Sequence, residues 1–130
     1  MNAINGALSG LKIVACSTAQ AGTVPYMLMA DLGADVIKIE TPVKKDNNRK
    51  SGYLFGDTSS FFETNNRGVK SLTLNLKSEK GQKILHKLVK EADIFGQNFR
   101  PGVAKKLNFD YETLEKINPK IIYASVSAYG

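Results

Sequence analysis

The hydrophobic positions of this chain fall into short apolar runs separated by polar segments that contain glycine. A buried strand needs a short run rich in β-branched or alternating apolar residues. Five runs of this kind predict strands, at residues 11–16, 35–40, 71–76, 93–98 and 120–126.

Between these runs, apolar residues recur at helical spacing. Pro25 suits the first turn of a helix, which we expect to run to Leu32 and to stop at the following glycine. Ser78 is a suitable cap for the next helix. Two short helices are predicted at residues 101–107 and 111–117. The helix after Ser78 carries an apolar stripe of Ile84, Leu85, Leu88, Val89 and Ala92.

The alternation of strands and helices predicts one α/β domain built on an open, mostly parallel sheet with helices on both faces. No helix follows the last predicted strand to cover it. Because interior parallel strands are covered on both faces, we expect that the chain is truncated or that a partner covers its last strand.

Residues 41–70 interrupt the pattern and are predicted to form a long loop. A loop of this length in a compact domain is usually functional or mobile. Its first part is basic, with Lys44, Lys45, Arg49 and Lys50 against Asp46. A solvated loop is the simpler interpretation of this run, and a contact with phosphate is the alternative.

Composition narrows the possible functions. The 130 residues contain 18 Lys and Arg against 12 Asp and Glu, so the net charge of +6 favours anionic partners such as a phosphorylated cofactor or nucleic acid. One Cys and one His exclude an intrachain disulfide and a Cys/His zinc site, and no metal is expected. We expect a cytoplasmic protein, because we find no secretory signal and no membrane-spanning run.

Ligands of open α/β sheets bind beyond the carboxyl ends of the strands. The first such loop, at residues 19–25, lacks the glycine fingerprint of dinucleotide-binding proteins, and the chain has no phosphate-binding P-loop motif. Cys16 is expected to be a packed core thiol. His86 lies outside the apolar stripe and is expected to be exposed to solvent.

Asn98 and Phe99 stand at the end of the fourth predicted strand, followed by Arg100 and Pro101 at a helix start. Helix starts attract anions, and Asn and Arg side chains can add contacts. Phe99 is suited to stacking on a flat ring such as adenine, but packing in the protein alone would also explain it.

The chain resembles the family III CoA-transferases of the CaiB/BaiF type, which include formyl-CoA transferase and carnitine CoA-transferase. The matching blocks are residues 10–14, 30–40, 66–77 and 98–102. The resemblance implies a Rossmann-like fold, of which residues 1–130 are the N-terminal part of the large CoA-binding domain. It also implies an interlocked homodimer that moves CoA from an acyl-CoA to a carboxylic acid, through an Asp acyl-anhydride and an enzyme–CoA thioester.

The resemblance also implies the residues that contact coenzyme A, which would be a substrate. Thr41 departs from the pattern, because some members have an Arg there, and Cys16 and Ala15 replace common residues of the first strand end. The implied contacts are Ala19, Gln20, Leu74, Lys77, Asn98, Phe99, Lys106 and Leu107.

The family's catalytic Asp and smaller domain lie beyond Gly130, so we expect no catalytic residue within the chain and no transfer by the chain alone. The main alternative is a non-catalytic CoA-binding fragment or a partner subunit. A basic nucleic-acid-binding domain has no motif to support it, and we expect neither nucleic acid nor membrane as a partner. A degraded gene product is a further alternative.

Overall fold

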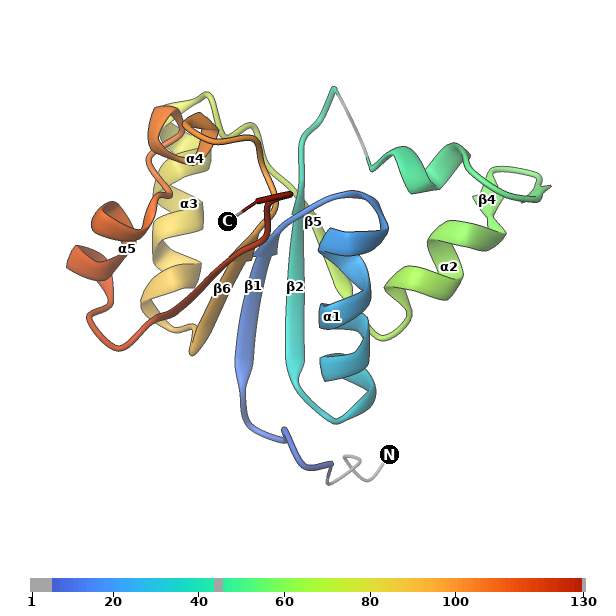
Figure 1. The fold of residues 1–130 in the computed structure, drawn as a ribbon, viewed down its shortest axis with the longest axis horizontal. Helices are drawn as coiled ribbons and strands as arrows, with labels where there is room; N and C mark the ends of the chain where they lie inside the picture. The colour runs from blue at the N-terminus through green and yellow to red at the C-terminus, as the bar shows by residue number, and fades with distance from the viewer. Residues whose placement is uncertain (1–5, 44–45, 130) are drawn as a thin grey trace.

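A five-stranded sheet forms the centre of the molecule (Figure 1), which a computed structural model describes for residues 6–43 and 46–129. The strand order is β5-β2-β1-β6-β7, and all four pairings are parallel. This confirms the predicted Rossmann-like α/β fold. The strands are β1 (Lys12–Cys16), β2 (Asp35–Glu40), β5 (Lys70–Thr73), β6 (Ile94–Gln97) and β7 (Ile122–Ser125).

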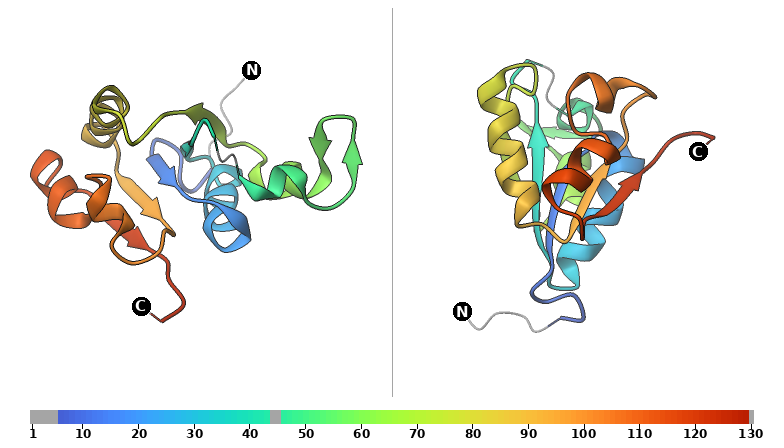
Figure 2. Two further views of the ribbon diagram at one scale, coloured as in Figure 1. Left: turned by 90° about the horizontal axis from the view of Figure 1, so that it is seen from above. Right: turned by 90° about the vertical axis from the view of Figure 1, so that its left-hand side faces the viewer.

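Helices cover both faces of the sheet (Figure 2). The path from β1 through β2 to β5 runs toward one edge, and its helices α1 (Ala19–Asp31) and α2 (Ser60–Asn66) lie on one face. The path from β5 through β6 to β7 runs the other way, so right-handed crossovers place its helices on the opposite face. These are α3 (Glu79–Lys90), α4 (Val103–Lys106) and α5 (Tyr111–Ile117).

Two hydrophobic clusters form the core, one on each face of the sheet. Ile13 and Ala15 of β1 pack with Tyr26 of α1. The alternate residues of β1, Val14 and Cys16, face the opposite cluster, which includes residues of α3 and α5. The continuous apolar run in the sequence follows from this burial on both faces. At the edge of the sheet, Ile122 of β7 is 62% exposed.

The predicted start of the first helix at Pro25 is wrong. Helix α1 begins at Ala19, so only Ser17 and Thr18 separate it from β1. Tertiary packing outweighs the hydrogen bond lost at Pro25, because four residues of the helix are buried against the sheet and its surroundings. The four are Gly22, Thr23, Tyr26 and Met27.

The prediction of one long loop at residues 41–70 is also wrong. This region contains a 3₁₀ helix, η1 (Asn47–Lys50), a hairpin of β3 (Leu54–Phe55) and β4 (Thr58–Ser59), and helix α2. Local side-chain caps start the helical parts: the Asp46 carboxylate accepts the N–H of Asn48, and the Ser59 hydroxyl accepts the N–H of Phe62. Lys44 and Lys45 of the predicted basic run lie outside the described residues.

Candidate functional site

A cavity of about 270 Å³ lies where the carboxyl ends of β1, β2, β5 and β6 meet. This is the edge of the sheet where open α/β folds bind their ligands. Thr18 follows β1, Thr41 follows β2, and Leu76 and Phe99 come from the segments after β5 and β6. The remaining lining residues are Ile39, Glu40, Asp46 and Asn47.

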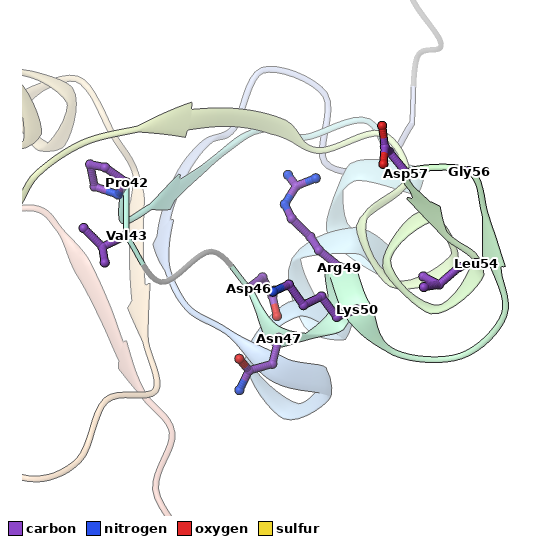
Figure 3. Close-up of a pocket in the computed structure, with 9 residues that line it drawn as sticks. All are labelled: Pro42, Val43, Asp46, Asn47, Arg49, Lys50, Leu54, Gly56 and Asp57. Carbon is purple, nitrogen blue, oxygen red and sulfur yellow. The ribbon is translucent and has the colours of Figure 1, made fainter.

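A larger hollow of about 740 Å³ lies between the segment that leaves β2 and the β3–β4 hairpin (Figure 3). It shares Asp46 and Asn47 with the smaller cavity. Ligand pockets in proteins measure about 300–1,000 Å³, so the two hollows offer space on the scale of a cofactor-sized ligand. The larger hollow is also lined by Pro42, Val43, Arg49, Lys50, Leu54, Gly56 and Asp57.

The Asn98 side chain joins the end of β6 to the turn that precedes α1. Its Oδ1 accepts the N–H of Thr18 at 2.9 Å, and its Nδ2 donates to the carbonyl oxygen of Thr18 at 2.7 Å. The bare backbone of Gly22 makes room for this amide, since a Cβ there would lie 2.5 Å from Asn98 Nδ2. The amide of Asn98 therefore holds the turn in place.

Ala19 follows that turn with an unusual backbone conformation. Its φ of +59° lies in the left-handed region, which residues with a side chain rarely adopt. Its N–H donates to Asp46 Oδ1 at 3.2 Å, and the same oxygen accepts the N–H of Asn48 at 3.0 Å. A carboxylate from a distant segment thus binds the start of α1.

Asp46 in turn is paired with a buried lysine of β2. Lys38 is 2% exposed, forms an ion pair with Asp46, and donates to Asn66 Oδ1 at 2.7 Å. Burial lowers the pKa of Lys38, and the hydrogen bond to Asp46 opposes that shift. A buried charge is tolerated only with such partners.

Glu40, two residues further along β2, is held by a second set of polar contacts. Arg49 donates to both of its carboxylate oxygens, at 2.9 and 2.7 Å, and Ser71 donates at 2.8 Å. Burial alone would raise the pKa of Glu40, but the hydrogen bonds from Arg49 and Ser71 outweigh it and lower the pKa to about 2. The guanidinium carbon of Arg49 also lies 3.7 Å from the centre of the Phe62 ring.

We did not expect from the sequence that Lys38, Glu40 and Asp46 form buried ion pairs beside the cavity. A signal was present, because Lys38 and Glu40 alternate with isoleucines on a strand expected to be covered on both faces. Charges at such positions need buried partners, and the segment after the strand supplies them.

The residues expected to contact coenzyme A are only partly brought together. Phe99 lines the smaller cavity and packs against Phe109, with ring centres 5.5 Å apart. Leu74 is 8% exposed and belongs to the core. The others are the exposed Ala19 and Gln20 at the start of α1, Asn98 beside Thr18, the exposed Lys77 and Lys106, and the half-buried Leu107. Their contacts with coenzyme A remain predictions.

Cys16 and His86 take no part in this site. Cys16 is 1% exposed and lies in the core, as predicted, and burial raises the pKa of its thiol. The expectation that His86 is solvent-exposed is only partly right. The residue is half-buried, and its Nε2 lies 2.8 Å from the carbonyl oxygen of Asn108.

Within residues 6–43 and 46–129, no cluster of His, Cys, Asp and Glu side chains is suited to a metal ion. No helix in the same part of the chain is long and apolar enough to span a membrane.

Residues 8–130 match the sequence model of CoA-transferase family III. The chain belongs to CoA-transferase family III. Among curated family relatives it is 43% identical over 125 residues to the acetyl-CoA:oxalate CoA-transferase of Acetobacter aceti. That alignment covers 96% of this chain and 32% of the relative. It is 39% identical over 124 residues to the human succinyl-CoA:glutarate CoA-transferase, an alignment that covers 95% of this chain and 28% of that relative.

Solved structures agree with this membership. A CAIB/BAIF family protein from Brucella suis superimposes with a TM-score of 0.86 at 38% identity, over 93% of this chain and 33% of that one. The orthorhombic form of Rv3272 from Mycobacterium tuberculosis gives a TM-score of 0.88 at 33% identity, over 96% of this chain and 35% of that one. The chain therefore spans about a third of the length of these relatives.

Proposed function

We propose that this chain is the CoA-binding part of a CoA-transferase that moves CoA from an acyl-CoA to a free carboxylic acid. The observation that carries the proposal is the family III match over residues 8–130. The cavity at the carboxyl ends of four strands supports it, because this is where the fold class binds ligands. Relatives named for oxalate and glutarate suggest a small carboxylic acid as the acceptor.

Several residues that the family resemblance assigns to CoA suit its chemistry. Phe99 offers an aromatic ring at the cavity wall, to which the adenine ring is the matching partner. Lys77 and Lys106 are exposed cations suited to the phosphate groups of CoA. Gln20 adds an exposed amide side chain at the start of α1, next to the exposed Ala19.

In the proposed reaction, an Asp carboxylate attacks the thioester carbonyl and expels CoA thiolate, which leaves a mixed anhydride. The thiolate attacks the enzyme's acyl carbon in that anhydride, releases the donor acid and forms an enzyme–CoA thioester. The acceptor carboxylate attacks this thioester, and the expelled thiolate then takes the acceptor acyl group and regenerates the Asp.

We place this Asp outside residues 1–130 on the family resemblance, and five of the six Asp side chains in this chain have other partners. Asp31 pairs with Arg67, and Asp35 pairs with Lys70. Three others are engaged as well: Asp46 by Lys38, Asp93 by the N–H of Lys12, and Asp110 as the cap of α5. Asp57 lies in the exposed β3–β4 turn.

Calorimetric titration of the 130-residue chain with CoA tests the binding part of this proposal. A transfer assay of the longest natural form of the protein, with acetyl-CoA and oxalate, succinate or glutarate, tests the reaction. We expect CoA to bind and NAD⁺ to bind much more weakly. Absence of CoA binding contradicts the proposal. Binding without transfer by the longest natural form of the protein favours the alternative, a non-catalytic CoA-binding fragment or partner subunit.

A further inference from the structure

We propose that Asp46 is a positioning residue for the coenzyme-binding turn, because its carboxylate holds Ala19 in the conformation that starts α1. The inference rests on the proposed function. It assigns to Asp46 a role in presenting Thr18, Ala19 and Gln20 rather than a contact with the reacting atoms.

The start of α1 lacks the usual local cap. Thr18 occupies the cap position, but its side chain makes no capping hydrogen bond. The acceptor is instead Asp46 Oδ1, which comes from a segment 27 residues further along the chain. A side-chain carboxylate at a helix start satisfies an N–H and opposes the positive end of the helix dipole.

Ala19 needs this support because of its backbone. A φ of +59° is unfavourable for alanine and persists only where the surroundings impose it. Two side chains hold this part of the backbone. Asn98 makes two hydrogen bonds with the backbone of Thr18, and Asp46 accepts the N–H of Ala19. The position of the turn therefore depends on both side chains.

The orientation of Asp46 is itself fixed by buried contacts. Lys38 engages Oδ2 of the carboxylate, which leaves Oδ1 to accept the N–H groups of Ala19 and Asn48. Lys38 is held in turn by Asn66 and lies 5.3 Å from the centre of the Phe62 ring. This chain of contacts connects α2 and β2 to the turn, and Asp46 and Thr18 both line the smaller cavity.

The test compares Asp46→Asn with Ser59→Ala by calorimetric CoA titration and thermal melting. Ser59 is buried, donates to the carbonyl oxygen of Asn48 and caps α2, so its loss loosens η1 and α2 around Asp46 but leaves the bond from the Ala19 N–H to Asp46 in place. We expect Asp46→Asn to weaken CoA binding about tenfold, because Lys38 on one side and the N–H groups of Ala19 and Asn48 on the other all need an acceptor, and the amide of Asn has only one oxygen. Ser59→Ala is expected to lower the melting temperature and to leave the Kd within about twofold.

Repeating the Asp46 substitution in an Ala19→Gly variant distinguishes a positioning role of Asp46 from a loss of overall stability. Glycine adopts the left-handed conformation without help, so in Ala19→Gly the effect of Asp46→Asn on CoA binding is expected to shrink to about twofold. An undiminished effect in that background overturns the inference. Equal changes in Kd for Asp46→Asn and Ser59→Ala, at matched loss of melting temperature, overturn it as well.

Hydrogen exchange of the wild-type chain gives a readout that needs no folded variant. The Ala19 amide is expected to be protected, although it lies in the first turn of a helix, where amides normally exchange freely. Free exchange at Ala19 overturns the inference. If the wild-type chain does not bind CoA, the proposed function fails as well, whereas normal wild-type binding with matched responses of the variants overturns only the role of Asp46.

Discussion

Asn98 packs its amide against the backbone of Gly22, at a place where a Cβ atom would lie 2.5 Å from Nδ2. The same amide makes two hydrogen bonds with Thr18. This contact connects two segments that are distant in sequence, the turn after β1 and the turn after β6, at the edge of the sheet that carries the cavity.

Gly22→Ala is therefore expected to destabilise the chain, although alanine is the better helix former by about 1 kcal/mol. The new methyl group displaces Asn98 and breaks its bonds to Thr18, for a net loss of about 1–2 kcal/mol in urea unfolding. In an Asn98→Ala background, the same substitution is expected to be neutral or stabilising. Equal losses in both backgrounds contradict the contact.

Glu40 predicts a specific response to acid. Its pKa of about 2 in the folded chain lies below the ordinary value of 4.5, so its contribution to stability is complete above pH 4.5 and is lost as the pH falls toward 2. Wild type is expected to exceed Glu40→Gln by roughly 3 kcal/mol in free energy of unfolding at pH 6, and this advantage should disappear near pH 2.

The control for that experiment is Glu91→Gln, because Glu91 forms an exposed ion pair with Lys12. Exposed pairs contribute little, so this variant is expected to follow the wild-type curve. Parallel curves for wild type and Glu40→Gln between pH 6 and pH 2 would show that Glu40 lacks the stabilising contacts described above.

Gly96 and Tyr26 form a second contact that excludes a side chain. A Cβ at Gly96 would lie 1.5 Å from the Tyr26 hydroxyl oxygen. Gly96→Ala is expected to lower the free energy of unfolding by about 1–3 kcal/mol through overpacking of the buried face. In a Tyr26→Ala background most of that cost should vanish, and a cost that persists would place the clash elsewhere.

Cys16 is expected to resist modification in the native chain. The thiol is buried and its pKa is raised by that burial, so the reactive thiolate is scarce and inaccessible. Reaction with a thiol reagent such as dithionitrobenzoate should be fast in urea and at least about a hundredfold slower without it. Similar rates in both conditions contradict the assigned burial.

The centre of the sheet was predictable from the sequence because β1 is apolar on both faces, and the run at residues 11–16 reflects that burial directly. The start of α1 was not predictable. Ala19 has a left-handed φ and begins the helix in contact with Asp46, an acceptor that no local pattern indicates. Pro25 misled the prediction because tertiary packing keeps it inside a helix.

The site was predictable only in outline. Strand order places the cavity at the carboxyl ends, and Phe99 was singled out by its position after the fourth predicted strand. The buried ion pair of Lys38 and Asp46 depends on how residues 46–66 fold back over β2, and the sequence shows that region as irregular. Leu74, assigned to CoA by resemblance, lies in the core.

Nuclear magnetic resonance titration of the ¹⁵N-labelled chain with CoA tests the central claim most directly. We expect amide shift changes around the carboxyl ends of the strands, at Thr18, Ala19, Gln20, Leu76, Lys77, Asn98 and Phe99. An absence of shift changes at saturating CoA, or changes confined to the opposite edge of the sheet around Lys12 and Asp35, would contradict it.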